Sequence, residues 1–336
     1  MNSRERFHAV ANGQPVDRMP SFEEEIREDV LHTWRAQGMP AWVTTDNSRA
    51  FFGLDRVETI PVRFSPVAGK IRARADFKRI MRHYQEQPVR FLTRDYWEKK
   101  AREFKGRDFP LGLIGWNGFQ LPLFPPSPAA EHNEWDNLVN LYYQVKDNPD
   151  AVKEALNFVA DYYISIVRLA LTYLDFDFVT ISEPIATVRG PVISPKDFAY
   201  LCLPQYPKLM AAYRKMGIPK VIFSSINNVK LFLPAIAATG IDGMKITHLA
   251  NTGIDYAQLG QQYPNLLLLG GLDATTMLSN RQAIVQAVKH TAAPLLKRGR
   301  WLPALDDTVR ANVPYKRFQT YRKAVLEYIS TRKTGA

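Results

Sequence analysis

The chain is poor in cysteine, with Cys202 the single thiol in 336 residues. One thiol cannot form a disulfide within the chain, so a disulfide scaffold is excluded. A zinc or iron–sulfur site that needs two thiolates from one chain is excluded for the same reason. This cysteine usage favours an intracellular protein.

Long apolar runs are also lacking. The longest ones, such as 162–174, are helix-sized and are interrupted by charged residues such as Arg168. None reaches the roughly 18 uncharged residues that a bilayer span needs. The first twenty residues are charged and contain no apolar leader segment, so we expect a soluble, cytoplasmic protein that does not bind membranes.

Acidic residues are fewer than basic ones. The chain has 44 Lys and Arg against 33 Asp and Glu, a formal net charge of +11. A solvated basic surface is the simplest interpretation, and attraction of an anionic ligand or of a partner with an acidic face is the functional one. No zinc-finger, RNP or helix-turn-helix signature accompanies the charge, so nucleic acid is not an expected partner.

The second half of the sequence alternates between strand and helix patterns with short links. Apolar, β-branched runs predict strands at 176–182, 219–225, 241–248, 265–271 and 300–304. Helical patterns follow them at 196–216, 229–240, 255–263, 281–299 and 313–329. Repeated strand–helix units indicate a parallel sheet. Neither GxGxxG nor GxxxxGK[ST] occurs, which argues against a dinucleotide or P-loop domain.

The first half is less regular. It offers strands at 19–25 and 109–116 and helices at 26–38 and 148–174. The segment at about 45–110, and 56–107 in particular, is predicted to be an excursion outside the strand–helix alternation. Counted generously, eight strands are present. We therefore predict an α/β fold in which residues 1–336 form one (β/α)₈ TIM-type barrel with extra N-terminal elements. A doubly wound open sheet is the alternative.

Candidate site residues follow from position, because parallel strand–helix folds carry their sites at the carboxyl ends of the strands. This rule selects residues at or just after the carboxyl ends of the predicted strands: Glu24, Arg27, Glu183, Ser224, Asn227, Asn228, His248, Asp273, Asp306 and Asp307.

Each candidate has a structural alternative. Glu183 fits a general acid or base, or a solvated loop carboxylate. His248 titrates near neutrality and is the best single acid–base candidate, although a hydrogen-bonded structural histidine fits equally well. Asp306 and Asp307 suit a cation or a pyrrole-type N–H, or a turn cap. The segment 224–228 suits a pocket lining or an N-cap, and Arg27 and Arg189 could clamp a carboxylate.

The order of these features resembles the uroporphyrinogen decarboxylase superfamily. The matching pieces are 5–20, 182–209, 221–244, 266–278 and 299–323. The resemblance covers most of the chain and is weakest at 45–150. It implies a single (β/α)₈ barrel with a deep cleft at the carboxyl ends of the strands, and it is what favours the barrel over the open sheet.

The superfamily contains several chemistries. True decarboxylases remove carboxylates from a tetrapyrrole without a cofactor, and the resemblance implies that an N-terminal arginine segment pins those carboxylates. Here the corresponding stretch is PSFEEEIREDVLHTW (20–34), where Arg27 stands among acidic residues. A family histidine near the last strand is replaced by Asp306 or Asp307. Both departures argue against decarboxylation of that polyanion.

The other branch transfers methyl groups to or from a corrinoid or a thiol, and its zinc-dependent members use a His-x-Cys pair and a later Cys. At the positions of the His-x-Cys pair this chain has Ser224 and Ile226, and its cysteine, Cys202, falls in a predicted helix. A zinc ion would need oxygen and nitrogen ligands such as Glu183, His248 and Asp306. The pattern at 22–40 and 51–55 is similar to the little-characterised, methyltransferase-like side of the superfamily.

Three hypotheses follow. The first is an enzyme that moves a methyl group from a small methylated substrate to a corrinoid carried by an acidic partner protein. The second is a cofactor-free decarboxylase of a carboxylated tetrapyrrole or related acid, with Glu183 and His248 in proton transfer. The third is a non-catalytic barrel that binds a tetrapyrrole or a partner protein.

Overall fold

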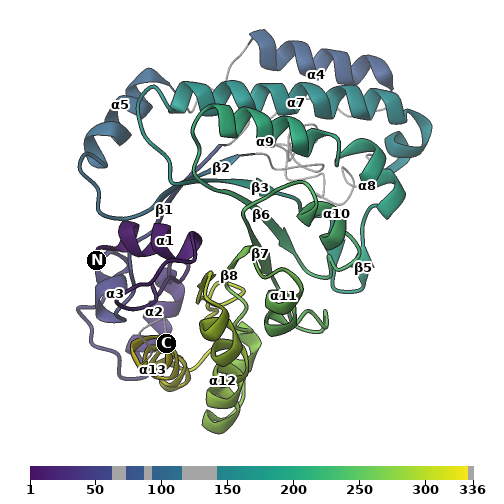
Figure 1. Cartoon of the computed structure of the whole chain (residues 1–336). Coiled ribbons are helices and arrows are strands. Elements are labelled where there is room, and N and C mark those ends of the chain that lie inside the picture. The colour runs from purple at the N-terminus through teal and green to yellow at the C-terminus, as the bar shows by residue number, and fades with distance from the viewer. Residues whose placement is uncertain (63–72, 87–92, 116–141, 332–336) are drawn as a thin grey trace.

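The computed structural model describes residues 1–62, 73–86, 93–115 and 142–331. Seven parallel strands form the central sheet: β1 (Glu58–Pro61), β2 (Leu111–Gly115), β3 (Phe178–Ser182), β6 (Val221–Ile226), β7 (Gly243–Thr247), β8 (Leu267–Leu269) and β9 (Trp301–Leu302). Their spatial order, β1-β2-β3-β6-β7-β8-β9, is also their order along the chain. The sheet curls as it proceeds from β1 to β8 (Figure 1). The described residues thus form a curled α/β half-barrel, and a closed eight-stranded barrel is not confirmed.

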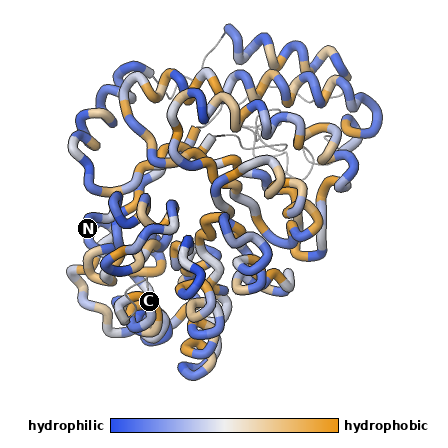
Figure 2. The backbone as a smooth tube through the Cα atoms, viewed as in Figure 1, coloured by the Kyte–Doolittle hydropathy of each residue, from blue (hydrophilic) through white to orange (hydrophobic). Residues whose placement is uncertain are grey.

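Helices separate the strands. They are α1 (Ser3–Ala11), α2 (Glu28–Arg35), α3 (Thr45–Phe51), α4 (Arg74–Glu86), α5 (Arg94–Glu103), α7 (Pro149–Ala170), α8 (Pro195–Leu201), α9 (Gln205–Lys215), α10 (Leu233–Ala237), α11 (Tyr256–Gln262), the 3₁₀ helix η1 (Ala274–Leu278), α12 (Arg281–Arg298) and α13 (Tyr315–Thr331). The strands are predominantly hydrophobic, and the helices alternate between hydrophobic and hydrophilic residues (Figure 2). This contrast is expected when helices cover a buried parallel sheet.

Most predicted strands are confirmed, but two expectations for the first half were wrong. Residues 19–25 are not a strand. They are held by other contacts, such as the Asp55 N–H that donates to the Ser21 carbonyl at 2.8 Å. The predicted excursion at 56–107 contains β1, which pairs in parallel with β2. This short strand is terminal in the sheet and ends at Pro61, which is where a sheet tolerates proline.

The segment 196–216 also differs from its prediction as one helix. It forms α8 and α9, and Pro204 stands between them as the N-cap of α9. Proline lacks the N–H that a continuous helix would need. Cys202 is the C-cap of α8 and is fully buried. The link between the predicted strand 176–182 and the predicted helix 196–216 contains β5 (Gly190–Pro191), which pairs antiparallel with β4 (Ala186–Thr187).

Two buried contacts attach the N-terminal helices to the rest of the fold. The Trp34 indole on α2 donates to the Val313 carbonyl at 2.7 Å and stacks on Phe318 of α13. On the other side, α1 places Phe7 against Phe178, with ring centroids 5.4 Å apart. Helix α1 therefore covers the beginning of β3 and leaves the carboxyl ends of the strands uncovered by it.

None of the described helices is long and apolar enough to cross a membrane. The cytoplasmic location stays a prediction.

Candidate active site

One face of the curled sheet keeps partly exposed polar side chains. Ser182, Ser224 and Lys245 are direct partners across β3, β6 and β7, and each is half-buried. Their strand neighbours Ile181 and Phe223 are fully buried, and Phe223 approaches the Tyr206 ring of α9. Side chains alternate between the two faces along a strand. The two serines and the lysine therefore lie on the face opposite to helix α9, which is the inner face of the curled sheet.

Lys245 belongs to a group of ion pairs near the carboxyl ends of the strands. Its Nζ lies 2.7 Å from Glu24 Oε1, and the Thr308 hydroxyl donates to Glu24 Oε2 at 2.8 Å. His248 Nδ1 lies 3.5 Å from Asp307 Oδ2. We call Glu24, Lys245, His248, Asp307 and Thr308 the mouth cluster. It joins three chain segments that are far apart in sequence.

The electrostatics of the mouth cluster keep the Glu24 carboxylate ionised. Burial alone would raise the pKa of Glu24, but Lys245, Thr308 and the His248 charge outweigh burial and lower it. Asp307 also pairs with Arg310 at 3.0 Å. The cluster therefore offers two side chains that can donate a proton, the Lys245 ammonium and a ring N–H of His248, each beside a carboxylate.

The sequence-predicted residues Glu24, His248 and Asp307 thus meet in one place. Lys245 and Thr308 were not predicted. A signal for Lys245 existed, because a charged residue inside the apolar strand 241–248 must face a solvent-accessible side of the sheet.

Glu183 lies elsewhere. It follows β3 but is 0% exposed, and its charge raises the pKa of two buried groups on the helix side of the sheet, Cys202 and Tyr206, where burial is the larger cause. The Ser225 hydroxyl donates to the Glu183 carbonyl. The carboxylate is therefore a neighbour of the α8 and α9 core, separate from the mouth cluster.

The carboxylate of Asp306 is held by backbone N–H groups. One carboxylate oxygen accepts the Leu249 N–H at 2.6 Å, and the other accepts the Ala274 N–H at 2.7 Å. Burial raises the pKa of Asp306, although these two backbone donors oppose it. A carboxylate engaged at both oxygens is poorly placed to attack a substrate or bind a metal. Its geometry favours fixing the loops after β7 and β8.

The remaining predicted residues are scattered. Asn227 has φ 60° and donates its N–H to the Thr247 carbonyl, while the Asn228 N–H reaches the Thr187 carbonyl. Arg189 is exposed in the β4–β5 turn. Arg27 pairs with its neighbour Asp29 on the surface, with Nε 3.0 Å from Oδ1. Asp273 caps η1.

A metal held by Glu183, His248 and Asp306 does not fit this arrangement. Among the described residues, no three His, Cys, Asp or Glu side chains come together as a ligand group. Glu183 points to the core, and Asp306 uses both oxygens on backbone donors. We derive no chemical step through a metal.

Comparison with known proteins supplies the class. The profile of the family described as Uroporphyrinogen decarboxylase (URO-D) matches residues 131–328, more than half of the chain. The chain belongs to the uroporphyrinogen decarboxylase family, and the resemblance seen in the sequence is confirmed.

Solved structures add the architecture. A methyltransferase from Methanosarcina mazei superposes with a TM-score of 0.65 at 14% identity, over 98% of this chain and 99% of that one. A putative vitamin-B12-independent methionine synthase from Listeria monocytogenes gives a TM-score of 0.44 at 10% identity, over 94% and 97% of the two chains. The first establishes a shared fold and the second does not. No curated protein matches the sequence significantly.

Proposed function

We propose that this protein transfers a methyl group from a small methylated substrate to a corrinoid-type acceptor carried by a partner protein. The observation that carries the proposal is the mouth cluster, which places Lys245 and His248 at the carboxyl ends of β7 and its neighbours. The fold shared with a methyltransferase supports the same reaction class.

The chemistry needs a proton donor at this position. The lone pair of the acceptor forms a new bond to the methyl carbon, and the bond from that carbon to the oxygen, nitrogen or sulfur of the substrate breaks. The electron pair stays on the departing heteroatom, which takes a proton from His248 or Lys245. Ser182 and Ser224 lie in the same cross-strand row as Lys245 and supply hydroxyls that can orient the substrate.

The charges of the mouth cluster disfavour a polyanionic tetrapyrrole. In the described part of the chain, Lys245, Arg310 and Arg27 each pair with a nearby carboxylate. Exposed Glu25 adds negative charge beside Glu24. A ligand with many carboxylates would meet these acidic groups before it met an unpaired cation.

Decarboxylation of a smaller acid is the second candidate function, and Lys245 favours it. The Lys245 ammonium on the open face of the sheet can hold one substrate carboxylate in place of Glu24, with His248 delivering the proton that replaces carbon dioxide. A binding barrel without turnover stays the third possibility, and one assay separates all three.

The test measures product formation with the full chain. Methylated amines, methyl ethers and methyl thioethers are offered with cob(I)alamin, and methylcobalamin is followed by its visible spectrum. Carbon dioxide release is measured in parallel with uroporphyrinogen and with simple pyrrole acids. Methylation of the acceptor by one donor class supports methyl transfer, whereas carbon dioxide release without methylation contradicts it. Tight binding without either product supports the binding barrel.

Variants connect the activity to the site. We expect Lys245→Met and His248→Gln each to lower kcat by about 10²–10⁴, the usual contribution of a positioned proton donor. Lys78→Met on the exposed surface of α4 is the matched control. Turnover unchanged in both site variants would refute the role of the mouth cluster.

A further inference from the structure

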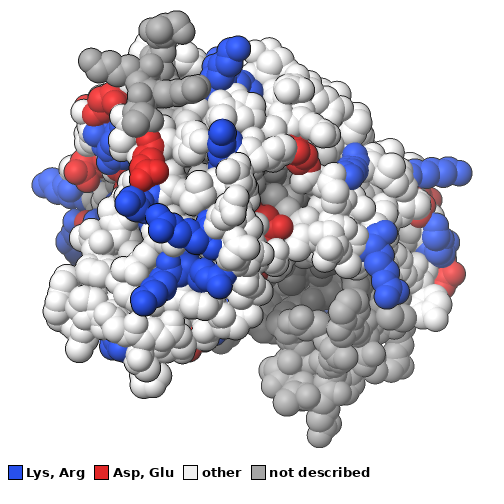
Figure 3. Space-filling model, turned by 90° about the horizontal axis from the view of Figure 1, so that it is seen from below, with Lys and Arg blue, Asp and Glu red and all other residues white. Residues whose placement is uncertain are grey.

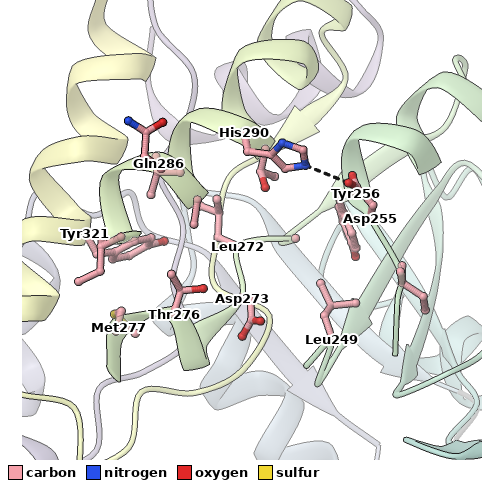
Figure 4. A pocket seen from close by; sticks show the side chains of 16 residues that line it. Leu249, Asp255, Tyr256, Leu272, Asp273, Thr276, Met277, Gln286, His290 and Tyr321 are labelled. Atoms are coloured by element: carbon pink, nitrogen blue, oxygen red, sulfur yellow. Dashed lines mark hydrogen bonds and ion pairs between the residues drawn. The ribbon is translucent and has the colours of Figure 1, made fainter. Parts of the chain in front are cut away.

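A cavity of about 420 Å³ lies between α11, η1 and α12 (Figure 4). Its lining includes no residue of the mouth cluster. Apolar side chains form much of its wall: Leu249, Leu272, Met277, Ile284 and Val288. Small-molecule sites usually span roughly 300–1,000 Å³ and combine apolar walls with a few polar groups.

The polar groups of the cavity are mostly acidic or neutral. Asp255 Oδ2 accepts from His290 Nε2 at 2.9 Å, and its Oδ1 accepts the Ala257 N–H at 2.7 Å. Asp255 is thus fully engaged. Asp273 uses one oxygen, Oδ1, for the Thr275 N–H and hydroxyl. Its other oxygen, Oδ2, has no hydrogen-bond donor among the described residues.

The charge balance of the cavity is negative. Burial alone would raise the pKa of Asp255, but the hydrogen bonds from His290 and from two backbone amides outweigh it and lower that pKa. Asp255 is therefore ionised at neutral pH, and His290 is the partner of this one carboxylate. Asp273, whose carboxylate has no cationic partner among the described residues, lines the same cavity as Thr276, and apolar walls strengthen the attraction of a carboxylate for a cation.

We propose that this cavity binds a small organic cation, a primary or secondary ammonium compound with a hydrocarbon body. The ammonium donates to Asp273 Oδ2 and to the Thr276 hydroxyl, while the hydrocarbon packs on Leu272, Met277 and Val288. The site is separate from the mouth cluster and does not depend on the reaction proposed there.

The test is calorimetric titration of the full chain with phenethylammonium. Two matched probes are 3-phenylpropionate, which reverses the charge, and 2-phenylethanol, which removes it. We expect saturable one-to-one binding of the ammonium, at least about tenfold tighter than that of either probe, because a hydrogen bond to a charged group contributes a factor of this size. No saturable binding, or equal binding of the three probes, would overturn the proposal.

Substitutions in the cavity, and one in the mouth cluster as a control, locate the site. Asp273→Asn, which keeps the shape of the side chain, should weaken ammonium binding about tenfold. Val288→Trp should fill the cavity and abolish binding, and Thr276→Val tests the same wall if that variant does not fold. Lys245→Met in the mouth cluster should leave the affinity unchanged. Binding that survives both Asp273→Asn and the cavity-wall variant, or that is lost in Lys245→Met, would contradict the assignment.

Discussion

Asp306 and Asp307 are neighbours in the chain, but their carboxylates have different partners. Asp307 reaches His248 and Arg310 at the mouth. Asp306 turns the other way, is 3% exposed, and binds backbone N–H groups of two loops. One of these loops begins at His248, whose own N–H donates to the Asp306 carbonyl. Asp306 therefore positions the loop that carries a candidate proton donor.

Replacing Asp306 with Asn tests this positioning role. The amide has one oxygen, so it can accept from Leu249 or Ala274 but leaves the other buried N–H unpaired. We expect Asp306→Asn to lower the free energy of unfolding by about 1–3 kcal/mol. Denaturant unfolding followed by circular dichroism measures it. Asp175→Asn, at an exposed position, is the control, and an Asp306→Asn variant as stable as this control would contradict the structural role.

The rule that sites lie at the carboxyl ends of parallel strands located the chain segments of the candidate site, but it did not separate the side chains that point into it from those that point away. Glu24, His248 and Asp307 were selected because they stand at or just after the ends of predicted strands, and the structure brings them together although 19–25 is not a strand. The same rule selected Glu183 and Asp306, which face the core or the backbone. Strand boundaries read from sequence are uncertain by a residue or more, and a shift of one residue reverses the direction of the side chain.

Among the elements, α1, β2 and β3 are joined by one buried carboxylate. Asp177, just before β3, is 0% exposed. It accepts from Arg4 Nε at 2.8 Å, from Arg107 at 2.8 Å and from the Leu111 N–H at 2.8 Å. Burial would raise the pKa of Asp177, but its hydrogen bonds, with His8 foremost, hold that pKa well below its usual value.

The direction of this shift sets a pH dependence. A carboxyl group whose pKa is lower in the folded state stabilises the fold above its unfolded value of about 3.9, and loses that contribution as the pH falls. We expect Asp177→Asn to cost about 3–5 kcal/mol at neutral pH, because Arg107 is left buried without its partner. The variant should also lose less stability than the parent between neutral pH and pH ~3.

Chemical denaturation across this pH range measures both effects. The double variant Arg107→Met/Asp177→Asn provides the matched comparison, since it removes both charges and should recover part of the loss. A parallel pH profile for parent and Asp177→Asn would show that Asp177 is not the group responsible.

The hydrophobic pattern of the sequence predicted the secondary structure correctly where a strand is buried and continuous. The runs at 219–225 and 241–248 were confirmed as β6 and β7. It failed at 19–25 and at β1, where contacts distant in sequence decide. Ser21 and Glu23 are held by Arg322 and Leu305, roughly three hundred residues away along the chain, and no local pattern encodes such partners.

At the scale of the whole molecule, the positive charge is unevenly distributed. Residues 281–331 contain ten Lys and Arg against three Asp and Glu, a net +7 out of the total of +11. Figure 3 shows Lys and Arg side chains gathered on the lower face, beneath α12 and α13 of Figure 1. On these helices, Arg281, Lys289, Lys297, Lys316 and Lys323 are exposed, and none of them pairs with an acidic side chain of the described residues. We call these five residues the basic face.

Because these five side chains pair with no acidic group in the described part of the chain, the basic face suits a partner protein with acidic surface charge, such as the carrier in the proposed reaction. Complementary charges steer association and act mainly on the association rate, by 10–10³-fold at low salt in favourable cases. At 0.1 M salt the screening length is about 10 Å, so the effect should fade as salt is added.

The last prediction is that reversing two of these charges slows transfer to an acidic carrier protein. With Lys316→Glu/Lys323→Glu, we expect kcat/KM for the carrier to fall about tenfold at low ionic strength, and less in high salt. Transfer to free cob(I)alamin, which does not need the docking surface, should be unchanged in the same variant. The control Lys78→Glu/Arg82→Glu reverses two exposed charges on α4. An equal loss of kcat/KM in both double variants would mean that only the net charge of the protein matters, and would contradict a docking surface. A loss that is confined to Lys316→Glu/Lys323→Glu and relieved by salt assigns docking to the face formed by α12 and α13.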